Sequence, residues 1–348
     1  MAQETRAVVI HAPHDLRVDR VAVPDLGAGD VAVKIQRGGI CGSDLHYYHE
    51  GGFGTVRLKE PMVLGHEISG TVSAIGTAVK AVKIGDRVAV NPSLPCGVCR
   101  YCAAGVQNHC LDMRFYGSAM RFPHVHGGFR EMIVCTEAQA VPCGQETSHE
   151  IAAFAEPLAV CLHAVRRAGP LAGKRVLVTG CGPIGALTIL AARHAGAREI
   201  VATDVAASAV VMAEKIGADR GLNVGENADA LALYSENKGY FDVAFEASGN
   251  ASALRGAIAV VQPRGRIVQI GVAGDVTVPL NVLVAKEIEL LGTFRFHEEF
   301  AWAVELLATG KIDVRALLSA TFTLDQAMAA FDLASDRSKA MKVQLAFN

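Results

Sequence analysis

The stretch that most constrains the fold lies near the middle of the chain, at residues 174–194, and reads KRVLVTGCGPIGALTILAARH. Its opening, KRVLVTG, is typical of a buried parallel strand, and the residues from about Pro183 to His194 follow a helical pattern. A glycine-rich turn joins the two. A strand, a glycine turn and a helix in this order predict the first unit of a doubly wound parallel sheet.

The same alternation continues to about residue 294. We expect further strands at EIVATD, FDVAFEASG, GRIVQIG and IELLGTF, with helices over SAVVMAEKIGA and NASALRGAIAVV between them. The longest uncharged apolar stretch, Val176–Ala192, has enough length for a membrane span. Three glycines and a proline within its first ten residues favour the strand, turn and helix instead.

The turn after the first strand contains Gly180, Gly182 and Gly185 in the spacing G-x-G-x-x-G. These glycines would allow a tight turn, let the backbone approach a pyrophosphate, and let the helix pack closely on the strand. The free N–H groups at the start of the helix, near Pro183 and Ile184, favour phosphate binding. The turn therefore predicts a dinucleotide site, although glycines in this spacing also occur in ordinary turns.

Asp204 ends the next strand, 19 residues after Gly185. A carboxylate there can accept both hydroxyls of an adenosine ribose, whereas the alternative is a simple helix cap. It would repel a 2′-phosphate, and the following VAAS lacks an arginine that could accommodate one. We therefore expect NAD as the cofactor, with NADP second.

Residues before about 150 have a different texture, with short runs rich in Val and Ile, such as DVAVKIQ, HEISGTVSAI and DRVAVN. Gly, Pro and Asp separate these runs, which predicts a β-rich region. The segment after Phe300 contains two helical stretches, FAWAVELLATG and LDQAMAAFDLA. The final apolar MKVQLAF is expected to return to the first region as a strand.

Four cysteines lie within fifteen residues, in the spacing C-x2-C-x2-C-x7-C. The chain has nine cysteines, an odd number, and its start, MAQETRAVVIH, lacks the pattern of a signal peptide. We therefore expect a cytoplasmic protein in which these thiols hold a metal and form no disulfides. Zinc is favoured, with an iron–sulfur cluster as the lesser alternative. Four thiolates leave zinc no open position, so this site is structural; its ligands are Cys96, Cys99, Cys102 and Cys110.

The formal net charge of the 348 residues is −2, and no run of lysine or arginine stands out. Binding to nucleic acid depends on clustered cations that neutralise phosphates. The charge pattern therefore argues against nucleic acid as the main partner, and we expect a small-molecule substrate.

Three separate segments carry candidate ligands for a second metal. GGICGSDLHYY contains Cys41, LGHEISG contains His66 and Glu67, and FAEPLAV contains Glu156. Each residue alone has an ordinary structural explanation, such as a buried thiol, a core histidine or a helix cap. Their spacing along the chain cannot show that they converge.

Six stretches in this order resemble the zinc-dependent medium-chain dehydrogenases: GGICGSDLHYY, LGHEISGTV, GDRVAV, the four-cysteine segment, EPLAV and GCGPIG. The resemblance covers essentially the whole chain and is closest to the polyol branch, which includes sorbitol dehydrogenase. It implies an α/β fold with a GroES-like catalytic domain at residues 1–153 and a doubly wound Rossmann NAD-binding domain at 154–294. Residues 295–348 would complete the catalytic domain.

The resemblance also implies the roles of the candidate ligands. Cys41 and His66 would bind a catalytic zinc, with Glu156 in the third protein position either directly or through water, so we expect two zinc ions per chain. Glu67 would approach the metal transiently. Zinc would polarise a substrate hydroxyl, Ser43 would take its proton, and the proton would pass through the nicotinamide ribose to His46.

Two further stretches, CLDMRFYGSAMRFPHVHGGF and LLGTFRF, resemble those of the L-idonate 5-dehydrogenases. A sugar acid carries a carboxylate, which the planar fork of an arginine matches. Sorbitol, xylitol and threonine dehydrogenases remain alternatives, as does, more distantly, a non-catalytic relative. The resemblance implies a homotetramer. It also implies substrate contacts from Tyr47, Phe115, Arg121, Arg295 and Phe296.

Overall fold

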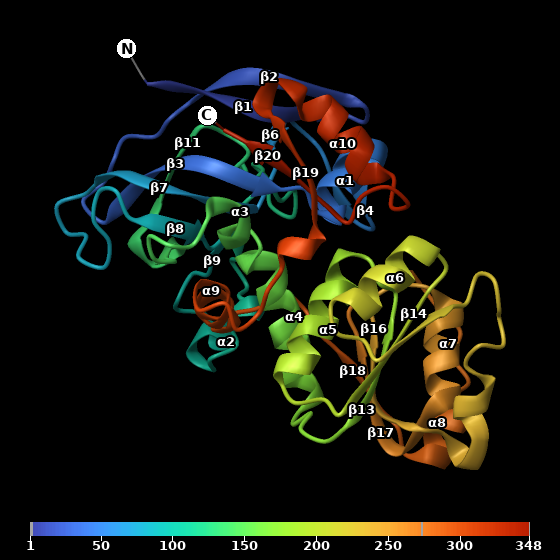
Figure 1. Ribbon diagram of the computed structural model, residues 1–348. Helices are drawn as coiled ribbons and strands as arrows, with labels where there is room; N and C mark the ends of the chain where they lie inside the picture. Colours follow the sequence, from blue (N-terminus) through green and yellow to red (C-terminus); the bar gives the residue numbers. More distant parts are fainter. Residues whose placement is uncertain (1–2, 273, 348) are drawn as a thin grey trace. The chain divides into compact units, whose positions relative to one another are not determined.

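The computed structural model describes residues 3–272 and 274–347. They form two compact units (Figure 1). Unit 1 runs to Glu156 and resumes at Phe300, and unit 2 comprises Pro157–Glu299. The sequence predicted these crossings after residues 153 and 294, so the structure moves both of them slightly towards the C-terminus.

The largest sheet of unit 1 contains seven strands. Strand β3 (Asp30–Gly39) pairs with β7 (Glu67–Ile75) on one side and with β20 (Lys342–Ala346) on the other, both antiparallel. The predicted return of MKVQLAF to the first region is therefore confirmed. The other strands of this sheet are β8 (Arg87–Val90), β11 (Met132–Thr136), β12 (Ala140–Pro142) and β19 (Leu318–Thr323).

Shorter elements surround this sheet, and aromatic side chains of Phe129, Phe331 and Phe347 pack in the core beside it. The remaining strands are β1 (Glu4–Ala12), β2 (Asp15–Ala22), β4 (Gly52–Phe53), β5 (Val56–Arg57), β6 (Met62–Val63), β9 (Ser93–Leu94) and β10 (Arg114–Phe115). The α-helices are α1 (Gly42–Glu50), α2 (Arg100–Ala103), α3 (His149–Ala152), α9 (Glu299–Ala308) and α10 (Ala327–Ser335), and α4 (Ala155–Ala168) begins here.

Unit 2 is a parallel sheet in the order β15-β14-β13-β16-β17-β18 with helices between its strands (Figure 1). The order reverses direction at β13 and β16, which is where a doubly wound sheet binds its ligand. The predicted α/β class is thus confirmed. The strands are β13 (Arg175–Thr179), β14 (Glu199–Asp204), β15 (Arg220–Asn223), β16 (Phe241–Glu246), β17 (Val261–Gln269) and β18 (Glu289–Gly292). The helices are α5 (Pro183–His194), α6 (Ala207–Lys215), α7 (Ala251–Val260) and α8 (Leu280–Lys286).

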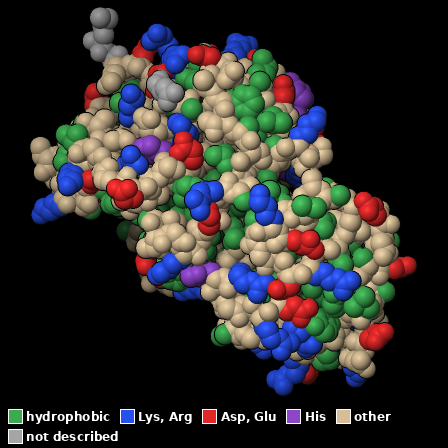
Figure 2. All heavy atoms as spheres, viewed as in Figure 1, with side chains coloured by type: hydrophobic (Ala, Val, Ile, Leu, Met, Phe, Trp, Pro, Cys, Tyr) green, Lys and Arg blue, Asp and Glu red, His purple; other side chains and the backbone are tan. Residues whose placement is uncertain are grey.

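None of the helices in the described ranges has the length and apolar character that a membrane crossing requires. Figure 2 shows acidic and basic side chains distributed over the face in view. This mixture agrees with the small formal net charge of −2.

Candidate functional site

The four-cysteine segment folds into a compact lobe in unit 1. Cys99 precedes α2, Cys102 lies on it, and Cys110 follows the short 3-10 helix Gln107–His109. The four sulfur atoms lie within 4.8 Å of one another, with 3.6 Å between Sγ of Cys99 and Sγ of Cys102. A tetrahedral zinc with Zn–S bonds of about 2.3 Å would require S···S distances of about 3.8 Å, so the lobe fits zinc.

The backbone of the lobe prepares its sulfur atoms for a cation. Sγ of Cys110 accepts the N–H groups of Cys96 at 3.2 Å and of Asp112 at 3.3 Å. N–H groups, first that of Leu111, lower the pKa of Cys99 to about 6, whereas burial raises the pKa of Cys102 to about 12. The N–H groups around Cys99 therefore favour the thiolate, which is the form that binds a metal.

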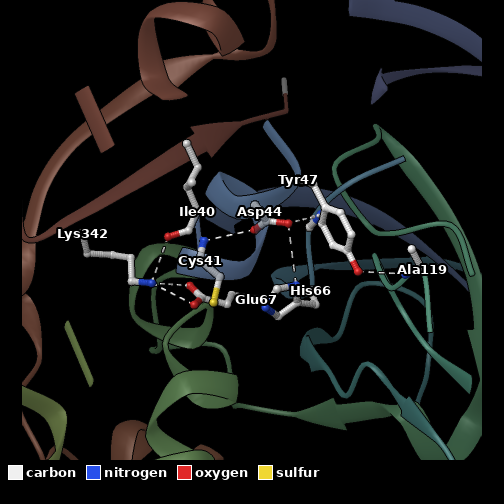
Figure 3. A network of polar contacts seen from close by, with 9 residues as sticks. Ile40, Cys41, Asp44, Tyr47, His66, Glu67, Ala119 and Lys342 are labelled. Carbon is white, nitrogen blue, oxygen red and sulfur yellow. Dashed lines mark hydrogen bonds and ion pairs between the residues drawn. The ribbon is translucent and has the colours of Figure 1, made fainter. Parts of the chain in front are cut away.

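A second donor cluster forms from residues that are distant in sequence. Cys41 stands at the start of α1, and His66 and Glu67 stand at the start of β7. One donor atom from each of the three lies within 4.8 Å of the others (Figure 3). We call Cys41, His66 and Glu67 the donor centre.

Asp44 joins the two segments that carry the donor centre. It occupies the third position of α1, where its Oδ2 accepts the N–H of Cys41 at 3.0 Å. Its Oδ1 accepts the N–H of Gly65 at 3.1 Å and lies 3.8 Å from Nδ1 of His66 (Figure 3). Asp44 is fully buried, and burial raises its pKa. The Asp44 carboxylate therefore holds the backbone of both segments that carry ligands. It also faces the His66 ring, as the supporting residues of metal sites commonly do.

Lys342 enters the donor centre from the last strand, β20. Its Nζ donates to Oε1 and Oε2 of Glu67 at 2.8 and 2.7 Å, and to the carbonyl of Ile40 at 3.1 Å (Figure 3). The side chains of Lys342 and Glu67 are only 3% and 2% exposed. Burial alone would lower the pKa of Lys342, but the neighbouring anionic groups, first Glu67, outweigh burial and raise it.

Glu156, predicted as the third zinc ligand, lies in the first turn of α4 and is buried. Burial raises its pKa to about 8, and the charges of His66, Glu67 and Cys41 also act on it. The set of three atoms within 4.8 Å contains Glu67 in place of Glu156. Glu156 therefore lies close enough to interact electrostatically with the donor centre, whereas Glu67 is one of its three members.

Burial, followed by the charge of Glu67, raises the pKa of the Cys41 thiol to about 11. Without a metal this thiol keeps its proton at neutral pH, and a bound zinc ion would displace it. The donor set consists of one sulfur, one nitrogen and one oxygen atom that lie within 4.8 Å of one another, and it fits zinc.

The predicted proton-relay residues lie on one face of α1. Ser43 and His46 are three positions apart, so their side chains are neighbours on the helix surface. Ser43 is partly exposed and the His46 side chain is 50% exposed, whereas Asp44 and Tyr47 point into the core. Helix α1 therefore presents the relay pair outward and the supporting residue inward.

The predicted substrate residues in unit 1 have different surroundings. The Phe115 ring lies 5.6 Å from the His66 ring, beside the donor centre. Tyr47 is 1% exposed, and its hydroxyl accepts the N–H of Ala119 at 2.9 Å (Figure 3). The guanidinium of Arg121 donates to the carbonyls of Leu111 and Met113 and lies 3.1 Å from a carboxylate oxygen of Asp112. These contacts favour a structural role for Arg121, which holds the end of the cysteine lobe.

The remaining predicted substrate residues, Arg295 and Phe296, belong to unit 2. The guanidinium carbon of Arg295 lies 5.0 Å from the centre of the Phe294 ring, and Phe296 is 1% exposed. Arg295 has a φ of 53°, in the left-handed region that non-glycine residues seldom adopt. Backbone conformations of this kind cluster at functional sites, although they do not identify one.

The glycine turn of unit 2 has the predicted form. Gly180 has a φ of 84°, and a Cβ on Gly185 would lie 1.7 Å from the carbonyl oxygen of Gly180. Helix α5 begins at Pro183, with Ile184 in its first turn and Gly182 at its N-cap. Asp204 is fixed beside the turn, because Oδ2 accepts the N–H of Cys181 at 2.7 Å and Oδ1 that of Ala206 at 2.9 Å. The turn offers N–H groups to a pyrophosphate and a carboxylate to a ribose.

Two family models cover most of the chain. Residues 27–145 match the alcohol dehydrogenase GroES-like domain, and residues 183–309 match the zinc-binding dehydrogenase family. The chain belongs to the zinc-dependent medium-chain dehydrogenases. Two relatives of this dehydrogenase cover nearly all of it. The L-idonate 5-dehydrogenase (NAD(P)(+)) of Escherichia coli K12 is 43% identical over 100% of both chains. The sorbitol dehydrogenase of Bacillus subtilis is 33% identical over 99% of this chain and 97% of its own.

A solved structure gives the same result for the fold. The crystal structure of L-idonate 5-dehydrogenase from Escherichia coli K-12 matches this dehydrogenase with a TM-score of 0.96. The match covers 100% of this chain and 99% of that chain at 43% identity. The predicted family and the predicted pair of folds are therefore confirmed.

The structure adds two residues that the sequence did not reveal as part of the site. Asp44 had a local signal, because an acid at the third position of a helix often caps that helix. Lys342 had another, since a lysine in the apolar segment MKVQLAF must find an anion if the segment is buried. Neither signal names its partner, which only the folded chain supplies.

Proposed function

We propose that this dehydrogenase oxidises the secondary hydroxyl at C5 of L-idonate to give 5-keto-D-gluconate, passes the hydride to NAD, and also runs in reverse. The broader class is that of zinc- and NAD(P)-dependent polyol and sugar-acid dehydrogenases. The observation that carries the finer proposal is a complete donor centre in a chain 43% identical, over its full length, to an L-idonate 5-dehydrogenase. A non-catalytic relative would be expected to lack part of that centre.

The positions of the side chains support the proposed catalytic roles. Zinc held by Cys41 and His66, with Glu67 or Glu156, would supply a Lewis acid that makes a substrate hydroxyl a better proton donor. Ser43, two residues after Cys41, accepts that proton through its hydroxyl oxygen. His46 then takes the proton towards solvent, because imidazole exchanges protons near neutral pH and this ring is half exposed.

Cofactor binding belongs to unit 2. Gly180, Gly182 and Gly185 allow the backbone to approach a pyrophosphate, and the N–H of Ile184, which follows Pro183 in the first turn of α5, is available to it. Asp204 carries a fixed negative charge where an adenosine ribose would bind, so a 2′-phosphate would meet repulsion. NAD is therefore the preferred cofactor, with NADP second.

Recognition of the sugar acid is assigned to Arg295, and Tyr47, Phe115 and Phe296 are proposed as further substrate contacts. An arginine fork matches a carboxylate with two parallel hydrogen bonds. The contact of the Arg295 guanidinium with the Phe294 ring supports this assignment because it restricts that group, and the positive φ of Arg295 is a conformation that clusters at functional sites. Arg121 is a weaker candidate, since its donors already contact the cysteine lobe.

A neutral polyol is the second candidate substrate. The sorbitol dehydrogenase of Bacillus subtilis is 33% identical over 99% of this chain, and a metal donor set of this kind does not require an acid group on the substrate. Xylitol and threonine are further possibilities of the same reaction type. The discriminating feature is a positive side chain placed for the carboxylate, and Arg295 is the residue proposed for it.

We also assign a homotetramer in the cytoplasm. A tetramer of paired dimers needs two different self-complementary surfaces on each subunit. Large exposed apolar side chains occur on two segments, the lobe region (Val98, Val106, Leu111, Met120, Phe122) and the region around the sheet edge β18 (Val276, Leu280, Val284, Leu290, Phe294). Light scattering that returned a stable monomer at micromolar concentration would reject the tetramer.

All nine cysteines are free thiols, in keeping with a reducing compartment.

The test is a substrate panel of L-idonate, 5-keto-gluconate, sorbitol, xylitol and threonine, each with NAD or NADP as appropriate to its direction. We expect kcat/KM for L-idonate with NAD to exceed that for sorbitol by about tenfold or more, the effect of one charge-assisted hydrogen bond. A higher value for sorbitol, xylitol or threonine would replace the proposed substrate while keeping the reaction type.

A further inference from the structure

A buried ion pair stands inside the donor centre. The Lys342 ammonium donates to both carboxylate oxygens of Glu67 and to the carbonyl of Ile40, so all three of its protons are used (Figure 3). Glu67 in turn supplies one of the three donor atoms that lie within 4.8 Å of one another. The Glu67 carboxylate is therefore hydrogen-bonded to a fixed ammonium group and is also positioned to coordinate a metal ion.

The space around Glu67 is built for this arrangement. A Cβ on Gly39 would lie 2.2 Å from Oε2 of Glu67, so the carboxylate occupies room that a side chain at Gly39 would fill. Gly39 ends β3, Glu67 begins β7 and Lys342 begins β20, and the register pairs Gly39 with Glu67. Three neighbouring strands of one sheet thus hold the carboxylate in place.

The charges explain what the lysine does there. Cys41, Glu67 and Glu156 can supply three negative charges to this region, and Lys342 faces them as a buried cation whose charge acts on all three. An ammonium bonded to both oxygens draws electron density from the carboxylate and weakens it as a ligand. A carboxylate freed from that contact would add its full charge to the metal site, and charge count is a main determinant of metal affinity.

We propose that Lys342 is a positioning residue that keeps Glu67 an exchangeable ligand of the catalytic metal, one that substrate can displace. This rests on the proposed metal role of the donor centre but not on the identity of the substrate. Without Lys342, Glu67 becomes a permanent ligand, so the metal is held more tightly while turnover falls. A lysine that served only to fill and stabilise the core would give the opposite metal result, because its loss would loosen the site.

The experiment measures zinc affinity by equilibrium competition with a chelator, using the complete protein. Three variants are compared with the parent: Lys342→Met, Glu67→Gln and the double variant. We expect Lys342→Met to bind the catalytic zinc about tenfold more tightly and Glu67→Gln about tenfold more weakly, the size of effect that residues beside metal ligands have. In the Glu67→Gln background, Lys342→Met should change the affinity less than about threefold, because the lysine acts through Glu67.

Turnover and the metal-free protein provide independent readouts. Lys342→Met should lower kcat about tenfold although its zinc is held more tightly, and its metal-free form should unfold at a lower temperature because Glu67 is left buried without a partner. The double variant should recover most of that lost thermal stability. The zinc of the four-cysteine lobe is an internal reference whose affinity should not move.

Controls separate charge from packing. Lys339→Met removes an exposed lysine of the same C-terminal segment, paired with Asp336 at 2.8 Å, and should leave zinc affinity unchanged. If Lys342→Met does not fold, Lys342→Gln takes its place, since an amide still donates to Glu67 without the charge, and it should also tighten zinc binding. Unchanged or weaker zinc binding in the folded variant, or the same effect of Lys342→Met with and without Glu67, would overturn the proposal. Failure of the L-idonate assignment would leave all these zinc measurements unaffected.

Discussion

The cysteine lobe and the donor centre both bring metal donors within 4.8 Å, yet the chain assembles them in different ways. The lobe draws its four sulfur atoms from fifteen consecutive residues, and its backbone N–H groups contact the sulfur of Cys110 directly. The donor centre draws on the start of α1 and the start of β7, with Lys342 reaching it from the last strand. The lobe carries no carboxylate among its donors, whereas the centre is surrounded by buried charge.

This difference separates a site expected to stabilise the fold from one proposed to perform the chemistry. Four thiolates complete the coordination of zinc and leave it nothing to bind, so the lobe can only hold its segment in shape. The donor centre has fewer protein ligands and keeps ionisable groups whose preferred states a metal ion would change. The pKa of Cys41 is raised to about 11 by burial and by Glu67, while that of Cys99 is lowered to about 6 by backbone N–H groups. Loss of one ligand should therefore damage activity at the centre and stability at the lobe.

The largest expected effect is on the donor centre. His66→Ala removes the nitrogen ligand, and with it a Lewis acid that contributes several kcal/mol to the reaction, so kcat/KM should fall by about a thousandfold. The thermal unfolding temperature should change little, because the lobe keeps its zinc. The measured zinc content should fall from two ions per chain to one. The exposed His194, replaced by alanine in the same way, should keep both ions and full activity. Full activity in His66→Ala would remove the centre from catalysis.

Cys99→Ser is the matching test on the lobe. Three remaining sulfur atoms hold zinc poorly, and if this costs about 3 kcal/mol the unfolding temperature should fall by roughly 4 °C. Folded molecules should keep their catalytic zinc and most of their kcat. Cys143→Ser, a buried cysteine outside the lobe, should retain two zinc ions. Equal losses of kcat and of stability in Cys99→Ser would erase the distinction between the two clusters.

The same contrast explains which parts of the molecule the sequence could reveal. The lobe and the glycine turn are local, since their residues act together at fixed short spacings, and both have the predicted form. The donor centre depends on sheet pairing between β3, β7 and β20, which no spacing records. The resemblance to known dehydrogenases could name Cys41 and His66, but it could not place Lys342 on Glu67.

Arg121 shows the limit of arguing from position along the chain. Its segment follows the lobe, where the resemblance suggests a substrate cleft, yet two carbonyls and Asp112 occupy its guanidinium. Arginine has five donors and readily satisfies nearby carbonyl groups when these are exposed at the end of a loop. Whether local acceptors occupy the donors of an arginine becomes visible only in the folded chain.

Arg295→Ala tests the proposed role of a unit 2 residue in substrate recognition, with a smaller expected effect than the loss of a metal ligand. Removing a charge-assisted hydrogen bond costs about 1.5–3 kcal/mol, so kcat/KM for L-idonate should fall roughly tenfold to a hundredfold. Sorbitol, which has no carboxylate, should be affected far less. Zinc content and NAD affinity should stay close to those of the parent.

Arg264→Ala is a matched control, because Arg264 also has a positive φ, 62°, and its side chain is 85% exposed. This variant should keep the kinetics of the parent with both substrates. Equal losses on L-idonate and sorbitol in Arg295→Ala would mean that Arg295 contacts hydroxyls common to polyols. If kcat/KM fell for neither substrate, Arg295 would have no role in recognition, and the main physical support for a sugar-acid substrate would be lost.

Asp204→Ala gives the smallest expected effect. It tests the glycine turn, whose residues are close together in the sequence. Asp204 is fixed by the N–H groups of Cys181 and Ala206, so its charge has a defined place beside the glycine turn. Removing it loses a hydrogen-bond acceptor for the ribose of NAD and also the repulsion of a 2′-phosphate, two changes that act in opposite directions on NAD and NADP. We expect the ratio of kcat/KM for NAD to that for NADP to fall by about tenfold, or 1.4 kcal/mol. The exposed Asp229, replaced by alanine in the same unit, should leave the ratio unchanged. If the parent already used both cofactors equally and Asp204→Ala did not change the ratio, the carboxylate would be a cap for its own turn, and cofactor choice would have to come from side chains outside that turn.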